Sequence, residues 1–167
     1  LEAKVTGSDT LLTIVHGGVS DFKGDAIVNA ANTGCLGGGG IDGLICDLGG
    51  PTLAAAREAL PLLRRCEYGQ RCDTGDAKIT VAGDLACDYV IHAVGPRCCN
   101  YGPFDVDLKV LADAYKNALL RAEAEKLSKV AFCIISAGIF RGGCPLKMIV
   151  DTGIKAIAEN TYSGLER

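Results

Sequence analysis

Short β-branched or apolar runs alternate with longer stretches of helical periodicity along this chain. Each run is brief enough to form a buried strand rather than a helix. We expect these strands in the interior of a sheet, at Leu11–Val15, Ala26–Ala30, Ala77–Val81, Tyr89–Val94 and Val130–Ile135. Helical patterns lie between the runs, at Ile41–Leu48, Pro51–Leu60, Asp107–Lys126 and Pro145–Asn160.

The alternation of strands and helices predicts the fold class. Strands joined by helices of this length form right-handed crossovers, which give a largely parallel or mixed sheet covered by helices on both sides. The pattern at Asp107–Lys126 fits such a covering helix, because its apolar residues fall on one face. No repeat, low-complexity tract or Pro/Ser-rich linker divides the sequence, so we predict a single α/β domain over residues 1–167.

Composition and charge narrow the classes of protein. The 167 residues are 49% apolar, yet no apolar run reaches the roughly 20 residues of a membrane span, and the N-terminus has no signal-peptide pattern. The formal charge is −3 with Lys and Arg scattered singly, so no basic stripe is present to bind a nucleic-acid backbone. We expect a soluble monomer with no nucleic-acid or membrane partner, in which an anionic ligand is held without a basic patch.

The cysteines predict reduced thiols and an intracellular location, cytoplasmic or nuclear. There are nine of them, an odd number, and they are spread over a chain with a substantial apolar core, unlike the cysteines of a small secreted scaffold. The alternative is a metal site, formed by Cys66 with Cys72 or by Cys98 with Cys99. No pair of CxxC motifs accompanies them and the chain has only two histidines, so we expect no metal and no redox cofactor.

Two loops are the places to look for a ligand. In open α/β sheets, ligands bind at the carboxyl ends of the strands, where loops lead into helix N-termini. Asn29–Ile41 follows the strand at Ala26–Ala30, and Ser136–Gly143 follows the strand at Val130–Ile135.

The first loop has the features of a phosphate site. The four glycines Gly37–Gly40 carry no side chains, so the backbone can approach a ligand closely with its N–H groups aimed inward. The helix expected from Ile41 adds the positive end of its dipole. The loop has neither the Lys-Ser/Thr of a P-loop nor the GxGxxG spacing of the dinucleotide fingerprint. A flexible surface turn is the alternative interpretation.

Polar residues flank this loop. Asn29 and Asn32 stand at the end of a buried strand, where amides that donate and accept can hold sugar hydroxyls. The alternative is that they only order the loop. Asp42 falls in the first turn of the helix, where a carboxylate is favoured electrostatically and position alone implies no function.

The second loop, at Ser136–Gly143, combines small residues with one aromatic side chain. Its backbone N–H groups are accessible to an anion, and Phe140 can lie against a ring or a ribose. An aromatic residue after a strand is, alternatively, part of the core.

Five ordered blocks of sequence are more specific together than either loop alone. They are Asp25–Asn32, Gly37–Gly43, Thr74–Thr80, Tyr89–Pro96 and Ser136–Phe140. This pattern resembles the macrodomain family, most closely the MacroD-type branch that removes ADP-ribose from acidic side chains and from O-acetyl-ADP-ribose. The resemblance covers the chain from about Leu12 to Asn160.

The resemblance implies a three-layer α/β/α fold with ADP-ribose in a cleft between the two loops. Asn32 would hold the distal ribose with Phe140 packed nearby, and Gly38–Ile41 and Ala137–Phe140 would wrap the diphosphate. Asp42 would position or activate a water that attacks the anomeric carbon, which suits an ionised carboxylate.

The residues that the resemblance assigns form two sets. The catalytic set is Asp42, Asn32 and Asn29. The ligand-binding set is Gly18, Val19, Ala30, Asn32, Gly38, Gly39, Gly40, Ile41, Ser136, Ala137, Gly138, Ile139 and Phe140. The expected ligands are ADP-ribose and ADP-ribosylated proteins.

Two positions depart from the family pattern. Gly18 stands where family members carry an Asp that binds the adenine amino group, and Asp21 or Asp25 is the possible substitute. Cys46 stands where the hydrolase branch has a His four residues after the Asp, and a thiol does not reproduce the hydrogen bonding of imidazole.

Three hypotheses follow. The first is an ADP-ribosyl-ester hydrolase and the second a non-catalytic ADP-ribose reader. The third, outside the family, is an enzyme acting on another phosphorylated metabolite. Members of the family also have a further strand after the last helix, inside the sheet, whereas this sequence stops at Arg167. Since a missing interior strand leaves backbone groups unpaired, we expect the protein to continue or another segment to fill that place.

Overall fold

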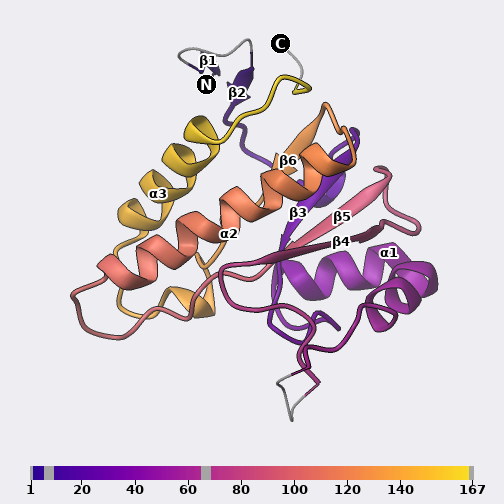
Figure 1. The fold of residues 1–167 in the computed structure, drawn as a ribbon, viewed down its shortest axis with the longest axis horizontal. Helices are drawn as coiled ribbons and strands as arrows, with labels where there is room; N and C mark the ends of the chain where they lie inside the picture. Colours follow the sequence, from indigo (N-terminus) through magenta and orange to yellow (C-terminus); the bar gives the residue numbers. More distant parts are fainter. Residues whose placement is uncertain (1, 6–9, 65–68, 166–167) are drawn as a thin grey trace.

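A mixed four-stranded sheet forms the centre of the molecule in a computed structural model that describes residues 2–5, 10–64 and 69–165. The strand order is β4-β5-β3-β6, with bounds Ala77–Val81, Tyr89–Ala93, Ala26–Ala30 and Val130–Phe132. β3 runs parallel to both β5 and β6, and β4 runs antiparallel to β5. The prediction of a mixed, largely parallel sheet is confirmed (Figure 1).

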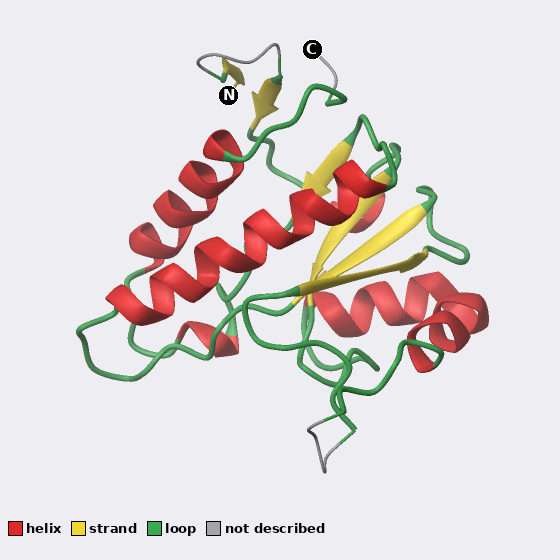
Figure 2. Cartoon of the chain, in the orientation of Figure 1, coloured by secondary structure: helices red, strands yellow, loops and turns green. Residues whose placement is uncertain are grey.

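Helices cover both faces of this sheet, which gives the three layers expected of the fold (Figure 2). Side chains alternate along each strand, so Ile27 and Val90 point to one face and pack with α1 (Ile41–Glu58). The opposite face packs against α2 (Asp105–Ala124), which in turn packs against α3 (Leu146–Glu159). The alternation therefore sorts the strand residues into an α1 face and an α2 face.

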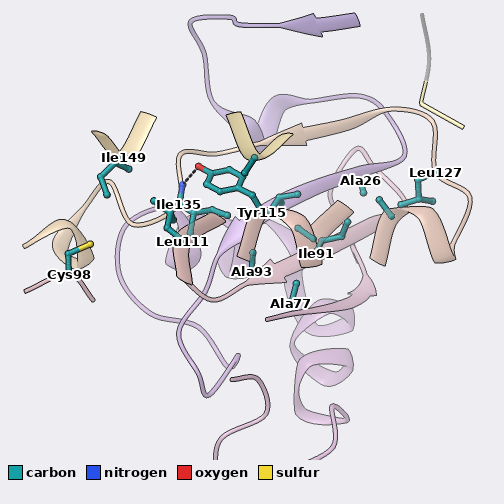
Figure 3. Packing of buried hydrophobic residues seen from close by; sticks show 14 of the residues in the cluster. Ala26, Ala77, Ile91, Ala93, Cys98, Leu111, Tyr115, Leu127, Ile135 and Ile149 are labelled. Carbon is teal, nitrogen blue, oxygen red and sulfur yellow. Dashed lines mark hydrogen bonds between the residues drawn. The ribbon is translucent and has the colours of Figure 1, made fainter. Parts of the chain in front are cut away.

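The larger hydrophobic core lies between the sheet and the pair α2 and α3. Its buried residues include Ile91 of β5, Leu111 and Tyr115 of α2, and Ile149 of α3 (Figure 3). The hydroxyl of Tyr115 accepts a hydrogen bond from the backbone N–H of Ile135 at 2.9 Å. This contact anchors the start of the second candidate loop to the core.

Helix α1 breaks at Gly50. This residue has φ 63° and ψ −163°, a conformation that is essentially restricted to glycine. Pro51 follows it, and proline suits the first turn of a new helix because it lacks an N–H. The ribbon of α1 changes direction along its length (Figure 1). The two separate helical patterns expected from the sequence are thus the two arms of one broken helix.

One expected strand was wrong in its place and its burial. Instead of entering the main sheet, β2 (Leu11–Thr13) pairs with β1 (Glu2–Lys4) in a separate two-stranded antiparallel sheet. Leu11 is 41% exposed and Val15 77%, so this apolar run is not interior. β6 also ends at Phe132, earlier than expected. Within the described ranges, no helix is long and apolar enough to cross a membrane.

Candidate functional site

Three polar side chains line up across the α1 face of the sheet. Asn29 of β3 and His92 of β5 are register partners, and Thr80 of β4 lies on the same face. His92 Nδ1 is 3.2 Å from Asn29 Nδ2, and His92 Nε2 is 2.9 Å from Thr80 Oγ1. Asn29 and His92 are fully buried. The sheet therefore holds a hydrogen-bonded polar line at the end of β3 that leads into the first loop.

Asp42 meets this line from the first turn of α1. Its Oδ1 accepts a hydrogen bond from Asn29 Nδ2 at 2.7 Å and another from Arg57 Nη2 at 2.7 Å. Its Oδ2 is buried and has no hydrogen-bond partner among the described residues, as is true of Asn29 Oδ1. A Cβ atom on Gly38 would lie 3.1 Å from Asp42 Oδ2. One buried acceptor, Asp42 Oδ2, is thus present beside the glycine loop, and a second lies on Asn29, whose amide is hydrogen-bonded to Asp42.

Arg57 is the counter-ion of Asp42 and is completely buried. The two residues are 15 positions apart on α1, which in a straight helix would separate them by about 22 Å along its axis. The break at Gly50 turns the second arm back, so that the guanidinium reaches the first turn. Arg57 Nε also donates to the carbonyl of Cys35, which fixes the guanidinium against the first loop.

His92 is held as a neutral imidazole. Burial, together with the positive charge of Arg57, lowers the pKa of His92 from 6.5 to about 3. A neutral ring has one donor and one acceptor nitrogen, so it can serve both neighbours only in one tautomer.

The first loop is ordered by Asn32. Its Nδ2 donates to the carbonyl of Gly37 at 2.8 Å, and its Oδ1 accepts from the backbone N–H of Gly34 at 3.0 Å. Both ends of the amide therefore make a hydrogen bond within the loop. Gly40, with φ 64°, immediately precedes α1. Gly38 to Gly40 are exposed, and a Cβ on Gly39 or Gly40 would meet nothing within 4 Å.

The second loop leaves the same edge of the sheet as the first, because β3 and β6 are parallel neighbours. Ser136 has φ 55° and donates from Oγ to the carbonyl of Pro96 at 2.8 Å. A short 3-10 helix follows at Ile139–Arg141. The half-buried Phe140 has the Arg97 guanidinium 4.8 Å from its ring centroid, and an added Cβ on Gly138 would meet nothing within 4 Å. Phe140 is thus at the surface of the loop and outside the core clusters.

The segment expected near adenine contains one available carboxylate. Gly18 precedes the 3-10 helix Val19–Asp21, and its added Cβ would lie 3.4 Å from Asp21 Oδ2. Asp25, the other possible substitute, accepts hydrogen bonds from the backbone N–H groups of Ser128 and Lys129 and from the Ser128 hydroxyl. Asp25 therefore anchors β3 to the segment before β6, whereas Asp21 lies beside Gly18.

Cys46 lies one helical turn after Asp42 and close to the loop. A Cβ on Gly37 would be 3.6 Å from Cys46 Sγ. The thiol therefore lies next to the start of the glycine run. The eight described cysteines are all free, while Cys66 lies outside the described residues. Over residues 2–5, 10–64 and 69–165, no group of three or more His, Cys, Asp or Glu side chains is placed to hold a metal.

Sequence reasoning missed the residues that support Asp42. Arg57 stands in a helix, and His92 and Thr80 stand in strands, outside the two candidate loops. The alternation of side chains along β5 and β4 places His92 and Thr80 on the same face as Val90. This alternation was the sequence signal that could have identified them. For Arg57 the signal was the Gly50-Pro51 pair, since it ends one helix and starts another.

Comparisons with known proteins agree with this arrangement. Residues 28–152 match the family model described as Macro domain. The chain is 43% identical over 148 residues to a macro domain-containing protein of Cupriavidus necator, covering 89% of this chain and 80% of that one. It is 37% identical over 156 residues to an O-acetyl-ADP-ribose deacetylase of Klebsiella pneumoniae (strain 342), covering 92% of this chain and 84% of that one.

A solved structure shows the same fold. The macrodomain of Oceanobacillus iheyensis with ADP superposes with a TM-score of 0.82 at 32% sequence identity, covering 99% of this chain and 85% of that chain.

Proposed function

This chain belongs to the macrodomain family, and from that premise we propose that it binds ADP-ribose and hydrolyses ADP-ribosyl esters. The substrates proposed are O-acetyl-ADP-ribose and proteins that carry mono-ADP-ribose on Asp or Glu. The observation that carries the proposal is a pair of buried, unpartnered acceptors, Asp42 Oδ2 beside Gly38 and Oδ1 of Asn29, whose amide is hydrogen-bonded to Asp42. Acceptors in this state are matched by O–H donors, such as a ribose hydroxyl or a water.

The binding half of the proposal rests on backbone groups. Gly38–Ile41 and Ala137–Phe140 would supply N–H donors to the diphosphate, with the start of α1 adding its dipole. Open space beside Gly39, Gly40 and Gly138 leaves this backbone accessible. The relative from Oceanobacillus iheyensis holds ADP, which contains the diphosphate and adenosine of ADP-ribose.

The catalytic half rests on Asp42. Arg57 and Asn29 both bind Oδ1, so the second oxygen is left to accept a proton from a water. A water oriented by a carboxylate is a better nucleophile toward the reacting carbon, and the negative charge also stabilises positive charge that develops on the sugar. Asn29 Oδ1 would accept a hydrogen bond from a hydroxyl of the distal ribose. Asn32 would keep the loop in shape, and the second proton of its Nδ2 would be donated to the same sugar.

A second candidate function is a non-catalytic reader of ADP-ribose. Cys46 favours it, because a thiol beneath the loop lacks the proton handling of the histidine expected there. The two functions share the binding site and differ in turnover.

The test combines calorimetry with a hydrolysis assay. We expect ADP-ribose to bind with measurable heat and O-acetyl-ADP-ribose to be converted to ADP-ribose and acetate, with release abolished in Asp42→Ala. Release from a protein modified on Asp or Glu tests the second substrate class. Binding without release of either product leaves the reader function. Absence of binding at about millimolar ADP-ribose contradicts both functions.

A further inference from the structure

The polar line on the α1 face contains two residues for which the proposed function has no use. Thr80 and His92 belong to neither loop, yet a continuous set of hydrogen bonds joins them to the site. Thr80 Oγ1 lies 2.9 Å from His92 Nε2, and His92 Nδ1 lies 3.2 Å from Asn29 Nδ2. Asn29 Nδ2 then donates to Asp42 Oδ1 at 2.7 Å.

Each member of this line dictates the orientation of the next. The Asp42 carboxylate only accepts hydrogen bonds, so the NH₂ end of Asn29 must face it. The second proton of that NH₂ points to His92 Nδ1, which must therefore be an unprotonated acceptor. The ring proton then belongs on Nε2, where Thr80 Oγ1 accepts it. Asn29 Oδ1 is left at the free end of the amide, with no partner among the described residues.

We infer that Thr80 and His92 are positioning residues that keep the Asn29 amide turned with Nδ2 toward Asp42 and Oδ1 free for a hydroxyl of the substrate. If the ring carried its proton on Nδ1, two donors would face each other. Rotation of the amide by 180° to relieve that clash would place its oxygen against the carboxylate. Asp42 Oδ1 would then lose one of its two hydrogen bonds. The inference rests on the proposed function, because the substrate it names is the ADP-ribosyl ester.

The charges around the ring favour the required state. Arg57 and Asp42 lie beyond Asn29, and Lys78 is the register partner of His92 on β4. Burial and the Arg57 charge both lower the pKa of His92, to about 3. The ring thus stays neutral across the range in which an ester hydrolase is assayed.

Two substitutions at Thr80 separate its hydrogen bond from its volume. Thr80→Val keeps the shape and removes the acceptor, whereas Thr80→Ser keeps the acceptor and removes a methyl group. We expect kcat on O-acetyl-ADP-ribose to fall on the order of tenfold to a hundredfold in Thr80→Val and to stay within about threefold in Thr80→Ser. The Kd for ADP-ribose should change by less than about threefold in both, because the loops that hold the diphosphate are untouched. A packing role predicts the reverse order of kcat.

A matched control and a spectroscopic measurement complete the test. Thr152→Val on α3 makes the same chemical change in a half-buried threonine on a helix that packs against α2, and it should leave kcat unchanged. ¹⁵N NMR of the imidazoles, of which the chain has two, should show His92 with a proton on Nε2 and none on Nδ1 at neutral pH. A proton on Nδ1 overturns the inference.

The outcomes separate the inference from the proposed function. If the parent protein hydrolyses no ADP-ribosyl ester, the proposed hydrolase function fails and the positioning role fails with it. If the parent is active and Thr80→Val keeps its kcat, only the inference fails. An active parent with a slow Thr80→Val variant, a fast Thr80→Ser variant and the Nε2–H ring supports it.

Discussion

Removal of the Asp42 carboxylate should destabilise the fold as well as the activity. Asp42 is 3% exposed and Arg57 is 0% exposed, and the Asp42→Ala substitution removes both 2.7 Å hydrogen bonds to Oδ1. It leaves a fully buried guanidinium whose remaining partner is the carbonyl of Cys35. Loss of one member of a buried ion pair costs about 3–5 kcal/mol. In a domain of this size each kcal/mol lowers Tm by about 2–4 °C, so Tm should fall by about 6–20 °C.

A double-mutant cycle tests this reasoning by thermal and urea unfolding. Arg57→Met removes the unpaired charge in the Asp42→Ala background, so the double variant should be more stable than Asp42→Ala alone, with a coupling energy of at least about 1–3 kcal/mol. It should remain inactive, because the carboxylate is still absent. Asp47→Ala, which removes an exposed carboxylate from the same helix, serves as the control and should change stability by less than about 0.5 kcal/mol.

Two results would refute the argument. The first is an Asp42→Ala protein whose Tm stays within about 2 °C of the parent, which would show that the buried pair contributes little. The second is strict additivity in the cycle, which would show that the two side chains do not act on each other.

Three further predictions concern His92, Gly50 and Cys46. The lowered pKa of His92, about 3 against 6.5, means that the unfolded chain binds one more proton between these values. The free energy of unfolding should therefore fall as pH drops below about 6.5, and this group contributes up to about 1.4 kcal/mol per pH unit. Urea titrations at about pH 7.5 and about pH 5.5 measure this pH dependence of stability. His92→Gln should make it weaker. Gly50→Ala places a Cβ against the Asp84 carboxylate at a backbone conformation that favours glycine, so it should lower stability by about 1–3 kcal/mol and lower kcat. Gly17→Ala, with open space around its Cβ, should change neither stability nor kcat. Equal melting curves of the two variants would contradict the role given to the break in α1. Cys46→His should raise kcat on O-acetyl-ADP-ribose on the order of tenfold or more at unchanged ADP-ribose affinity, and an unchanged kcat would mean that the histidine is dispensable in this chain.

The sequence was most informative where one physical rule acted alone. Ala26–Ala30 and Ala77–Val81 were predicted with the bounds that the structure has, because apolar and β-branched residues dominate both short runs. Leu11–Val15 shows the same kind of run and is nevertheless exposed, because composition does not reveal which strand will be its neighbour. Local pattern thus identifies a strand more reliably than its place in a sheet.

The site was predictable only in its loop half. Glycines and the start of a helix are adjacent in sequence, so the first loop could be interpreted directly. Asp42 was assigned a role through the resemblance, since position alone explained it by the helix dipole. Arg57 is 15 residues from its partner, and His92 is 63 residues from Asn29. The first pair depends on the helix break and the second on the register of two strands, and both features become visible only in the three-dimensional structure.

The break in α1 also constrains how sequences of this kind can change. The first arm carries the carboxylate and the second arm returns its counter-ion, so the lengths Asp42–Gly50 and Gly50–Arg57 set where the guanidinium arrives. An insertion of one residue between Gly50 and Arg57 would rotate Arg57 by about 100° around its arm, and one between Asp42 and Gly50 would rotate Asp42 by the same angle relative to the break. The triplet Asp-Gly-Arg at this spacing is therefore a signature that can be sought in distant homologues whose glycine loops have diverged.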